Sequence, residues 1–202
     1  MKKGKEFLFT VIMMLCITLV IAIMPTEKDA AIYTDTVRLH ILASSDSEAD
    51  QNVKYEIRDR ILRKYAAVLK NAHSPDKAKE NVAALTESIE KDVGDWLKEY
   101  GCDYGCTVTV GTEWYDTRKY EDFTLPKGYY TSLCVMLGKA EGKNWWCVMY
   151  PPLCLDIASE DAPPDAGVMG YTKEEYALIS NEEYQIKFKI LELFSDAFSK
   201  NG

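Results

Sequence analysis

The sequence lacks the short motifs that mark most cofactor-dependent and metal-dependent enzymes. It contains no glycine-rich phosphate loop, no dinucleotide-binding fingerprint and no helix with the paired histidines of a zinc protease. It also has no serine flanked by glycines in the pattern of a nucleophile elbow. Because each of these chemistries needs its motif, we expect a protein without a cofactor, without a small-molecule substrate and without a catalytic site.

Basic residues are too few to balance the acidic ones. Lys and Arg total 24 against 32 Asp and Glu, which gives a formal charge of −8 at pH 7. The first 24 residues carry a charge of +2, so the residues after them sum to −10. A domain this acidic is repelled by phosphate backbones and by anionic lipid head groups. We therefore expect no nucleic-acid partner, and any contact with a membrane has to come from an apolar segment.

The chain has one long apolar run, at its N-terminus. Residues 7–24 carry no charge and follow three lysines within residues 1–6. The run is longer than the core of most signal peptides and just reaches the span of a hydrocarbon layer, and its basic flank predicts that the rest of the chain lies outside. We interpret residues 1–24 as a signal peptide or signal anchor, 25–31 as a linker and 32–202 as an exported domain. Whether the segment is cleaved stays open.

Histidine is scarce, and cysteine is moderately frequent. Neither of the two histidines stands at a zinc-ligand spacing from a pair of cysteines, so we expect no metal site. Five cysteines follow the apolar run, and export would permit disulfides. Spacing makes two pairs candidates, Cys102 with Cys106 and Cys147 with Cys154. The odd number leaves at least one thiol free or paired to another molecule.

Apolar periodicity predicts a mixed α+β domain, with a small antiparallel sheet packed with about three helices. Alternating patterns predict four strands, and the last two of them, separated by a loop with Gly142, predict a β-hairpin. Spacings of three and four predict the helices. The predicted strands cover residues 32–42, 107–112, 129–138 and 144–150. The predicted helices cover residues 48–71, 75–100 and 184–198.

Two local signals predict where the first two helices begin. Ser45 followed by Glu48 has the spacing of a capping box. Ser74 before Pro75 places a capping serine ahead of a proline in the first turn.

The cluster most similar to a catalytic site is His40 with the serines and the aspartate that follow it. Hydroxyl, imidazole and carboxylate groups within seven residues raise an alternative function, an exported serine-type hydrolase acting on cell wall or peptide through His40 and Ser44 or Ser45. Triad members usually come from separate parts of a fold, however, and Ser45 and Asp46 already serve a turn and a helix start. We therefore favour a structural role for this cluster.

The densest group of large side chains surrounds Trp145 and Trp146. Alternation along a strand sends one of two adjacent tryptophans into the core and the other outward. An outward aromatic side chain on a strand is typical of a surface that binds another protein.

Three segments carry a resemblance to a known family. They are VRLHILASSDSEADQNVKYEIRDRIL at 37–62, LPKGYYTSLCVMLGKAEGKNWWCVMYPPLC at 125–154 and the terminal EYQIKFKILELF. In these motifs, and in its basic N-terminus followed by one apolar segment, the chain resembles the stage II sporulation protein R family of endospore-forming bacteria.

The resemblance implies a signalling role. Members of the family are made in the forespore and exported across its membrane into the intermembrane septal space. There they activate the membrane-embedded aspartic protease of the mother cell, which processes pro-sigma-E. We therefore expect this chain to bind that protease, and we expect the binding residues where the resemblance is densest. These candidate partner-binding residues are Arg38, His40, Ser45, Asp46 and Trp146.

Overall fold

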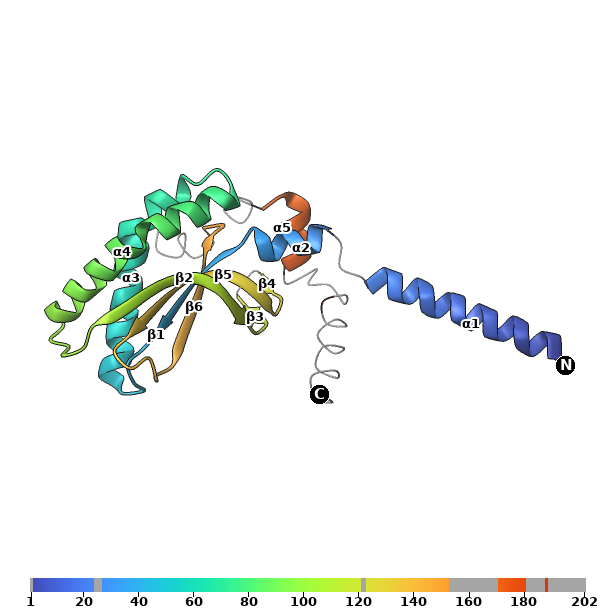
Figure 1. Cartoon of the computed structure of the whole chain (residues 1–202), viewed down its shortest axis with the longest axis horizontal. Coiled ribbons are helices and arrows are strands. Elements are labelled where there is room, and N and C mark those ends of the chain that lie inside the picture. Colours follow the sequence, from blue (N-terminus) through green and yellow to red (C-terminus); the bar gives the residue numbers. More distant parts are fainter. Residues whose placement is uncertain (1, 24–26, 121–122, 153–170, 181–187, 189–202) are drawn as a thin grey trace.

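The core of the molecule is a four-stranded mixed sheet (Figure 1). The computed structural model describes residues 2–23, 27–120, 123–152, 171–180 and 188. The strands are ordered β2-β5-β1-β6 across the sheet. Their bounds are Val37–Leu42 for β1, Cys106–Tyr115 for β2, Gly128–Leu137 for β5 and Asn144–Tyr150 for β6.

The first strand of the sheet lies between two strands that come much later in the chain. β1 runs parallel to β5 and antiparallel to β6. The predicted hairpin of residues 129–138 with 144–150 is therefore wrong in its pairing, although both strands form, and the sheet is mixed rather than antiparallel. β1 separates them because Val37, Leu39 and Ile41 are fully buried, and a strand this apolar is most stable with paired neighbours on both sides.

Two long helices cover one face of the sheet. They are α3 (Glu48–Lys70) and α4 (Pro75–Glu99), as predicted within a few residues (Figure 1). The buried side chains of α4 recur at spacings of four and seven, which is the pattern of a helix with one apolar face.

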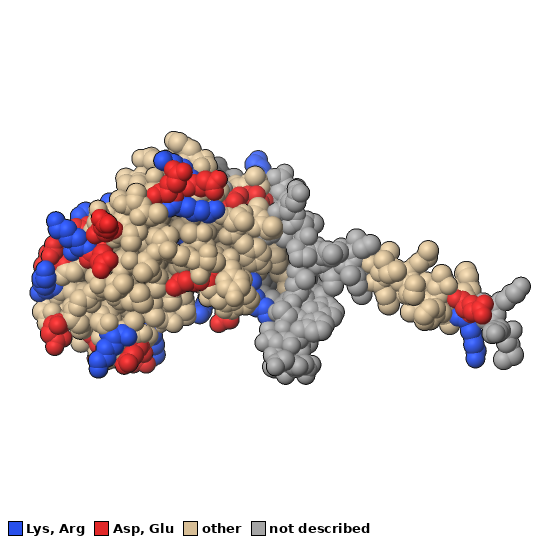
Figure 2. All heavy atoms as spheres, viewed as in Figure 1, with Lys and Arg blue, Asp and Glu red and all other residues tan. Residues whose placement is uncertain are grey.

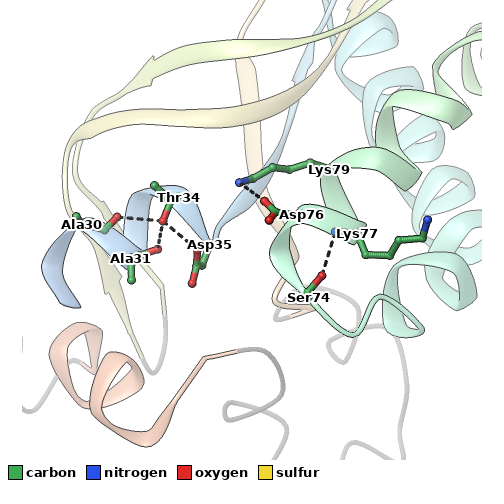
Figure 3. Close-up of polar contacts among 8 residues, drawn as sticks. All are labelled: Ala30, Ala31, Thr34, Asp35, Ser74, Asp76, Lys77 and Lys79. Carbon is green, nitrogen blue, oxygen red and sulfur yellow. Dashed lines mark hydrogen bonds and ion pairs between the residues drawn. The ribbon is translucent and has the colours of Figure 1, made fainter. Parts of the chain in front are cut away.

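The ends of α4 form as the sequence predicts. At its start the backbone N–H of Lys77 donates to Ser74 Oγ at 3.2 Å (Figure 3). At its end Gly101 adopts a φ of 73°, and the Gly101 and Cys102 N–H groups donate to the carbonyls of Lys98 and Leu97. This pair of bonds is a Schellman motif, in which glycine takes the left-handed conformation without a Cβ clash.

The segment before β1 differs from the sequence-based expectation. Residues 27–31, expected to be part of a linker, belong to α2 (Glu27–Thr34), and the predicted strand start at residue 32 is wrong, because β1 begins at Val37. Near the end of α2 the Thr34 hydroxyl contacts the Ala30 and Ala31 carbonyls and Asp35 Oδ1 (Figure 3). The alternation that predicted the strand lies in residues 37–41, and the burial of Ile32 is equally served by one face of a helix.

Smaller elements complete the described part of the chain. β3 (Arg118–Lys119) pairs with β4 (Thr124–Leu125), and α5 (Lys173–Ile179) packs against α2. α5 was not predicted, although Thr172 and Glu175 form a full capping box at its start. The predicted helix over 184–198 lies outside the described residues, except for Phe188, which is helical and buried.

The N-terminal helix α1 (Lys2–Ile23) extends away from the sheet (Figure 1). Charged side chains lie near its N-terminal end, and most of its visible surface is uncharged (Figure 2). Among the helices that the structure describes, none is both long enough and apolar enough to cross a membrane. The signal peptide or anchor over residues 1–24 stays a prediction.

The central position of β1 predicts a large stability loss when its side chains are shortened. Replacing Leu39, which is fully buried, by alanine should lower the free energy of unfolding by about 2–5 kcal/mol, because a cavity remains beneath the helices. Urea denaturation of the full chain, followed by circular dichroism, measures the change. The matched control is Val68→Ala on an exposed part of α3, which should stay within about 0.5 kcal/mol of the parent. Equal effects of the two substitutions would contradict the central placement of β1.

Candidate functional site

Arg38 and His40 point away from the long helices, onto the second face of the sheet. Successive strand residues face opposite sides, and Leu39 and Ile41 belong to the core beneath α3 and α4. The strand registers place His40 beside Cys134 of β5 and beside Trp146 of β6. We call the side chains gathered here the polar face. Its members are Arg38, His40, Glu113, Tyr115, Ser132, Cys134 and Trp146.

His40 lies at the centre of the polar face. Its Nδ1 is 3.2 Å from Glu113 Oε2 and 3.8 Å from Cys134 Sγ. Its ring stacks on the Trp146 indole, with ring centroids 5.4 Å apart and planes 22° apart. The side chain is only 14% exposed, and its Nε2 has no hydrogen-bond partner among the described residues. His40 is therefore held by contacts from three neighbouring strands.

Glu113 of β2 is the acidic member of the polar face. The hydrogen bond with His40 lowers the pKa of its carboxyl group to about 2, despite the opposing effect of burial. Hydrogen bonds with Ser132 and Cys134 lower this pKa further. The Tyr115 hydroxyl donates to Glu113 Oε2 at 3.4 Å and lies 2.6 Å from Ser132 Oγ. The carboxylate is consequently ionised at neutral pH and is held by several neighbours.

Cys134 is a buried thiol rather than an activated nucleophile. Burial raises its pKa to about 12, and the nearby Glu113 carboxylate adds to the increase, so the thiol stays protonated at neutral pH. In a cysteine–histidine–acid triad, the two partners contact different ring nitrogens. Here Cys134 and Glu113 both face Nδ1 of His40. These described residues do not have the arrangement of a catalytic triad.

Arg38 is a fully buried cation surrounded by aromatic rings. Its guanidinium carbon lies 3.9 Å from the ring centroid of Tyr115 and 5.0 Å from that of Tyr130. Its Nη2 donates to Tyr120 Oη at 2.8 Å, while Nε and Nη1 have no hydrogen-bond partner among the described residues. The negative faces of the rings stabilise the charge. Because Arg38 is 0% exposed, its role in this structure is to position the polar face rather than to contact a partner directly.

Trp146 is the aromatic side chain of the polar face that remains partly accessible. The Arg118 guanidinium carbon lies 3.7 Å from its ring centroid, and His40 stacks on the ring. Trp145 points to the helix-covered face instead, where Arg58 of α3 lies 5.1 Å from its ring centroid. The prediction that the two tryptophans face opposite sides is confirmed.

Ser45 and Asp46 lie in the turn that joins β1 to α3. Asp46 Oδ1 accepts the backbone N–H of Lys143 at 2.7 Å, which ties this turn to the loop between β5 and β6. The Ser45 hydroxyl donates to Asp50 Oδ2 and also accepts the Ser47 N–H. In this structure both side chains therefore stabilise the turn.

The predicted capping box of Ser45 with Glu48 is wrong. The Asp50 N–H donates to Ser47 Oγ at 3.2 Å, and α3 begins at the next residue, Glu48. Ser47 is thus the capping residue, and Ser45 stabilises the turn before it.

The alternative hydrolase depends on a contact between His40 and Ser44 or Ser45. The hydrogen bonds described for His40 go to Glu113 and Cys134. Ser44 is buried and accepts the Lys139 N–H at 3.5 Å, and Ser45 is engaged with Asp50. The geometry of the described residues gives no support to a serine–histidine pair.

The cysteines differ in part from the expected pairing. Cys102 and Cys106 are free thiols, so the disulfide considered for this pair is not formed. Burial raises the pKa of Cys106 to about 11, and its Sγ donates to the Glu90 carbonyl. Cys147 is disulfide-bonded, and Cys154 lies outside the described residues.

Comparison with known proteins relates this arrangement to a family. The model of the stage II sporulation protein R family matches residues 33–160, which include β1, β5, β6 and the whole polar face. The chain belongs to the stage II sporulation protein R family. It is 28% identical over 194 residues to stage II sporulation protein R of Bacillus subtilis (strain 168), a match that covers 86% of this chain and 87% of that protein. No solved structure matches the chain.

Only part of the polar face in this stage II sporulation protein R family member could be found from sequence. Arg38, His40 and Trp146 were named because they lie in the segments that resemble the family. The alternation of β2 places Glu113 and Tyr115 on one face, but β2 reaches His40 only through its pairing with β5 and that of β5 with β1. The polar-face and neighbouring residues that sequence reasoning missed are Glu113, Tyr115, Ser132, Cys134 and Arg118.

Gly142 lies so close to the Ser45 turn that a side chain at this position should destabilise the fold. A Cβ at Gly142 would lie 2.2 Å from the Ser45 carbonyl oxygen and 2.5 Å from its carbon. Gly142→Ala should therefore push the loop from the turn, weaken the bond from Gly142 N to Ala43 O and cost about 1–3 kcal/mol of unfolding free energy. Gly111→Ala, where a Cβ would meet no atom within 4 Å, is the control for thermal denaturation. A melting temperature for Gly142→Ala equal to that of the control would refute the contact.

The lowered pKa of Glu113 predicts a pH-dependent contribution to stability. Since its folded-state pKa is about 2 and its ordinary value 4.5, the ionised carboxylate stabilises the native state above pH 4.5. This contribution is lost as the pH falls from 4.5 towards 2. With solvent screening taken into account, the difference in unfolding free energy between the parent and Glu113→Gln should shrink by on the order of 1 kcal/mol across this window.

Denaturant unfolding at a series of pH values measures the difference. Glu87→Gln on the exposed surface of α4 serves as the control and should show a smaller change. A difference between the parent and Glu113→Gln that is constant with pH would rule out the proposed ionisation.

Proposed function

We propose that this protein is an exported sporulation signal, made in the forespore, that activates the membrane-embedded aspartic protease of the mother cell so that it processes pro-sigma-E. Membership in the stage II sporulation protein R family supports this role. The acidic excess and the uncharged N-terminal run of the sequence are consistent with action outside the forespore membrane.

The observation that carries the proposal is the Trp146 assembly on the face of the sheet opposite the long helices. Trp146 is half-buried, so part of its ring can meet another protein, while His40 and Arg118 fix its orientation. Pre-oriented tryptophan and arginine side chains are the types that contribute most to binding energy at protein interfaces. An activator needs such a contact surface and does not need a nucleophile.

Activation by binding requires a difference in affinity between two states of the protease. A ligand shifts an equilibrium only to the extent that it binds one state more tightly. Converting a mostly inactive population to a mostly active one requires a preference of about 5.5 kcal/mol. One aromatic anchor with its surrounding contacts supplies energy of this order when it fits one state alone.

Reconstitution in a non-sporulating host tests the role. This chain, the protease and pro-sigma-E are co-expressed, and processing is followed by immunoblot of the factor. Processing that requires export of this chain supports the proposal. An uncut precursor, with all three proteins present and this chain outside the membrane, would refute it.

Two tryptophan variants locate the contact in the same assay. Trp146→Ala should reduce processing at least about tenfold, because it removes the proposed anchor. The matched control is Trp114→Ala, since Trp114 is 54% exposed and contacts Tyr129 on the opposite face of the sheet. Export and circular dichroism are checked for both variants. If processing were lost with Trp114→Ala and kept with Trp146→Ala, the protease would contact the face of the sheet that carries Trp114.

A further inference from the structure

Three side chains of different chemistry converge on one point of the polar face. A ring nitrogen of His40, a carboxylate oxygen of Glu113 and the thiol Sγ of Cys134 all lie within 4.8 Å of one another. They come from three adjacent strands, β1, β2 and β5, and from sequence positions 21 to 94 residues apart. Without a metal ion, the Glu113 carboxylate accepts hydrogen bonds from both His40 and Cys134, which brings the three groups together.

The distances match those between ligands of a tetrahedral zinc ion. Zn–N and Zn–O distances of about 2.0–2.1 Å and a Zn–S distance of about 2.3 Å, at tetrahedral angles, separate N from O by about 3.4 Å and N from S by about 3.6 Å. The observed distances are 3.2 Å from Nδ1 to Oε2 and 3.8 Å from Nδ1 to Sγ. Each of these two distances lies roughly 0.2 Å from its tetrahedral value, and the third distance, from the carboxylate oxygen to Sγ, is within 4.8 Å.

We propose that His40, Glu113 and Cys134 bind a zinc ion through these three atoms. The fourth tetrahedral position is left to water or to a donor atom of a partner molecule. Binding requires the thiol of Cys134 to lose its proton to solvent and the hydrogen on His40 Nδ1 to move to Nε2, so that Nδ1 offers its lone pair; thiolate, carboxylate and Zn²⁺ then sum to zero charge. A neutral complex is compatible with this partly buried face, where Arg38 already provides a cation.

The ligand set distinguishes between metals. A thiolate and an imidazole favour zinc and similar transition metals, whereas magnesium and calcium prefer oxygen ligands. Neighbouring groups already hold the proposed ligands in place. The Tyr115 hydroxyl bonds Glu113, and the stack on Trp146 fixes the plane of His40. Such second contacts orient metal ligands and strengthen binding.

Metal titration of the full chain tests the proposal independently of signalling. The untagged protein, purified in mild detergent without oxygen, is titrated with Zn²⁺ and separately with Co²⁺. We expect one metal ion and one released proton per chain, and a cobalt spectrum with a thiolate charge-transfer band. Cys134→Ser should weaken zinc binding at least about 100-fold and abolish that band. The matched control Cys102→Ser removes another free, half-buried thiol and should bind as the parent does.

Three outcomes would overturn the proposal that these residues bind zinc. They are the absence of stoichiometric zinc binding by the parent, a cobalt spectrum without the thiolate band, and unchanged affinity in Cys134→Ser. Should Cys134→Ser not fold, Glu113→Gln keeps the side-chain volume and tests the same site, with circular dichroism as the check on folding. Parent-like zinc affinity in a folded Glu113→Gln would also refute the three-ligand arrangement.

Discussion

The insertion of β1 between β5 and β6 is the constraint on which the rest of the molecule depends. β1 is the strand that joins β6 to the rest of the sheet, so its register fixes which residues of the flanking strands become neighbours. On one side of β1 this register buries Leu39 and Ile41 against the helices. On the other it sets His40 beside Cys134 and Trp146. The apolar core and the polar face are thus two results of one pairing.

The polar face shows how a sheet can hold cations without surrounding them with carboxylates. Arg38 lies over tyrosine rings, and Arg118 lies over a tryptophan ring. Ring faces offer weaker attraction than carboxylates, but they require less desolvation of a second charge. Glu113 therefore stays available to His40 rather than being neutralised by an arginine. With both arginines held over aromatic rings, the Glu113 carboxylate can contact the imidazole of His40 and the thiol of Cys134.

Local signals in the sequence predicted much of the fold, and long-range pairing limited the rest. The helices over 48–71 and 75–100 follow from apolar spacing and from Ser74, all of which act within a few residues. The adjacency of residues 129–138 and 144–150 in the chain suggested a hairpin, because nothing local reveals that a strand from residues 37–42 separates them. Arg38, His40 and Trp146 were named from the family resemblance, whereas the contacts of His40 with Glu113 and Cys134 depend on strand pairing that no local signal reveals.

The place of β1 in the chain also sets the order in which the domain can assemble. The strand at the centre of the sheet is made early, yet its contact with Cys134 spans 94 residues of sequence. Loops of this length close slowly, and sheets built from distant segments fold later than helical pairs. During synthesis the helices α3 and α4 emerge long before a partner for β1 exists. The edges of β1 therefore stay unpaired until β5 has been made, and β5 ends at Leu137, 95 residues after β1 ends at Leu42.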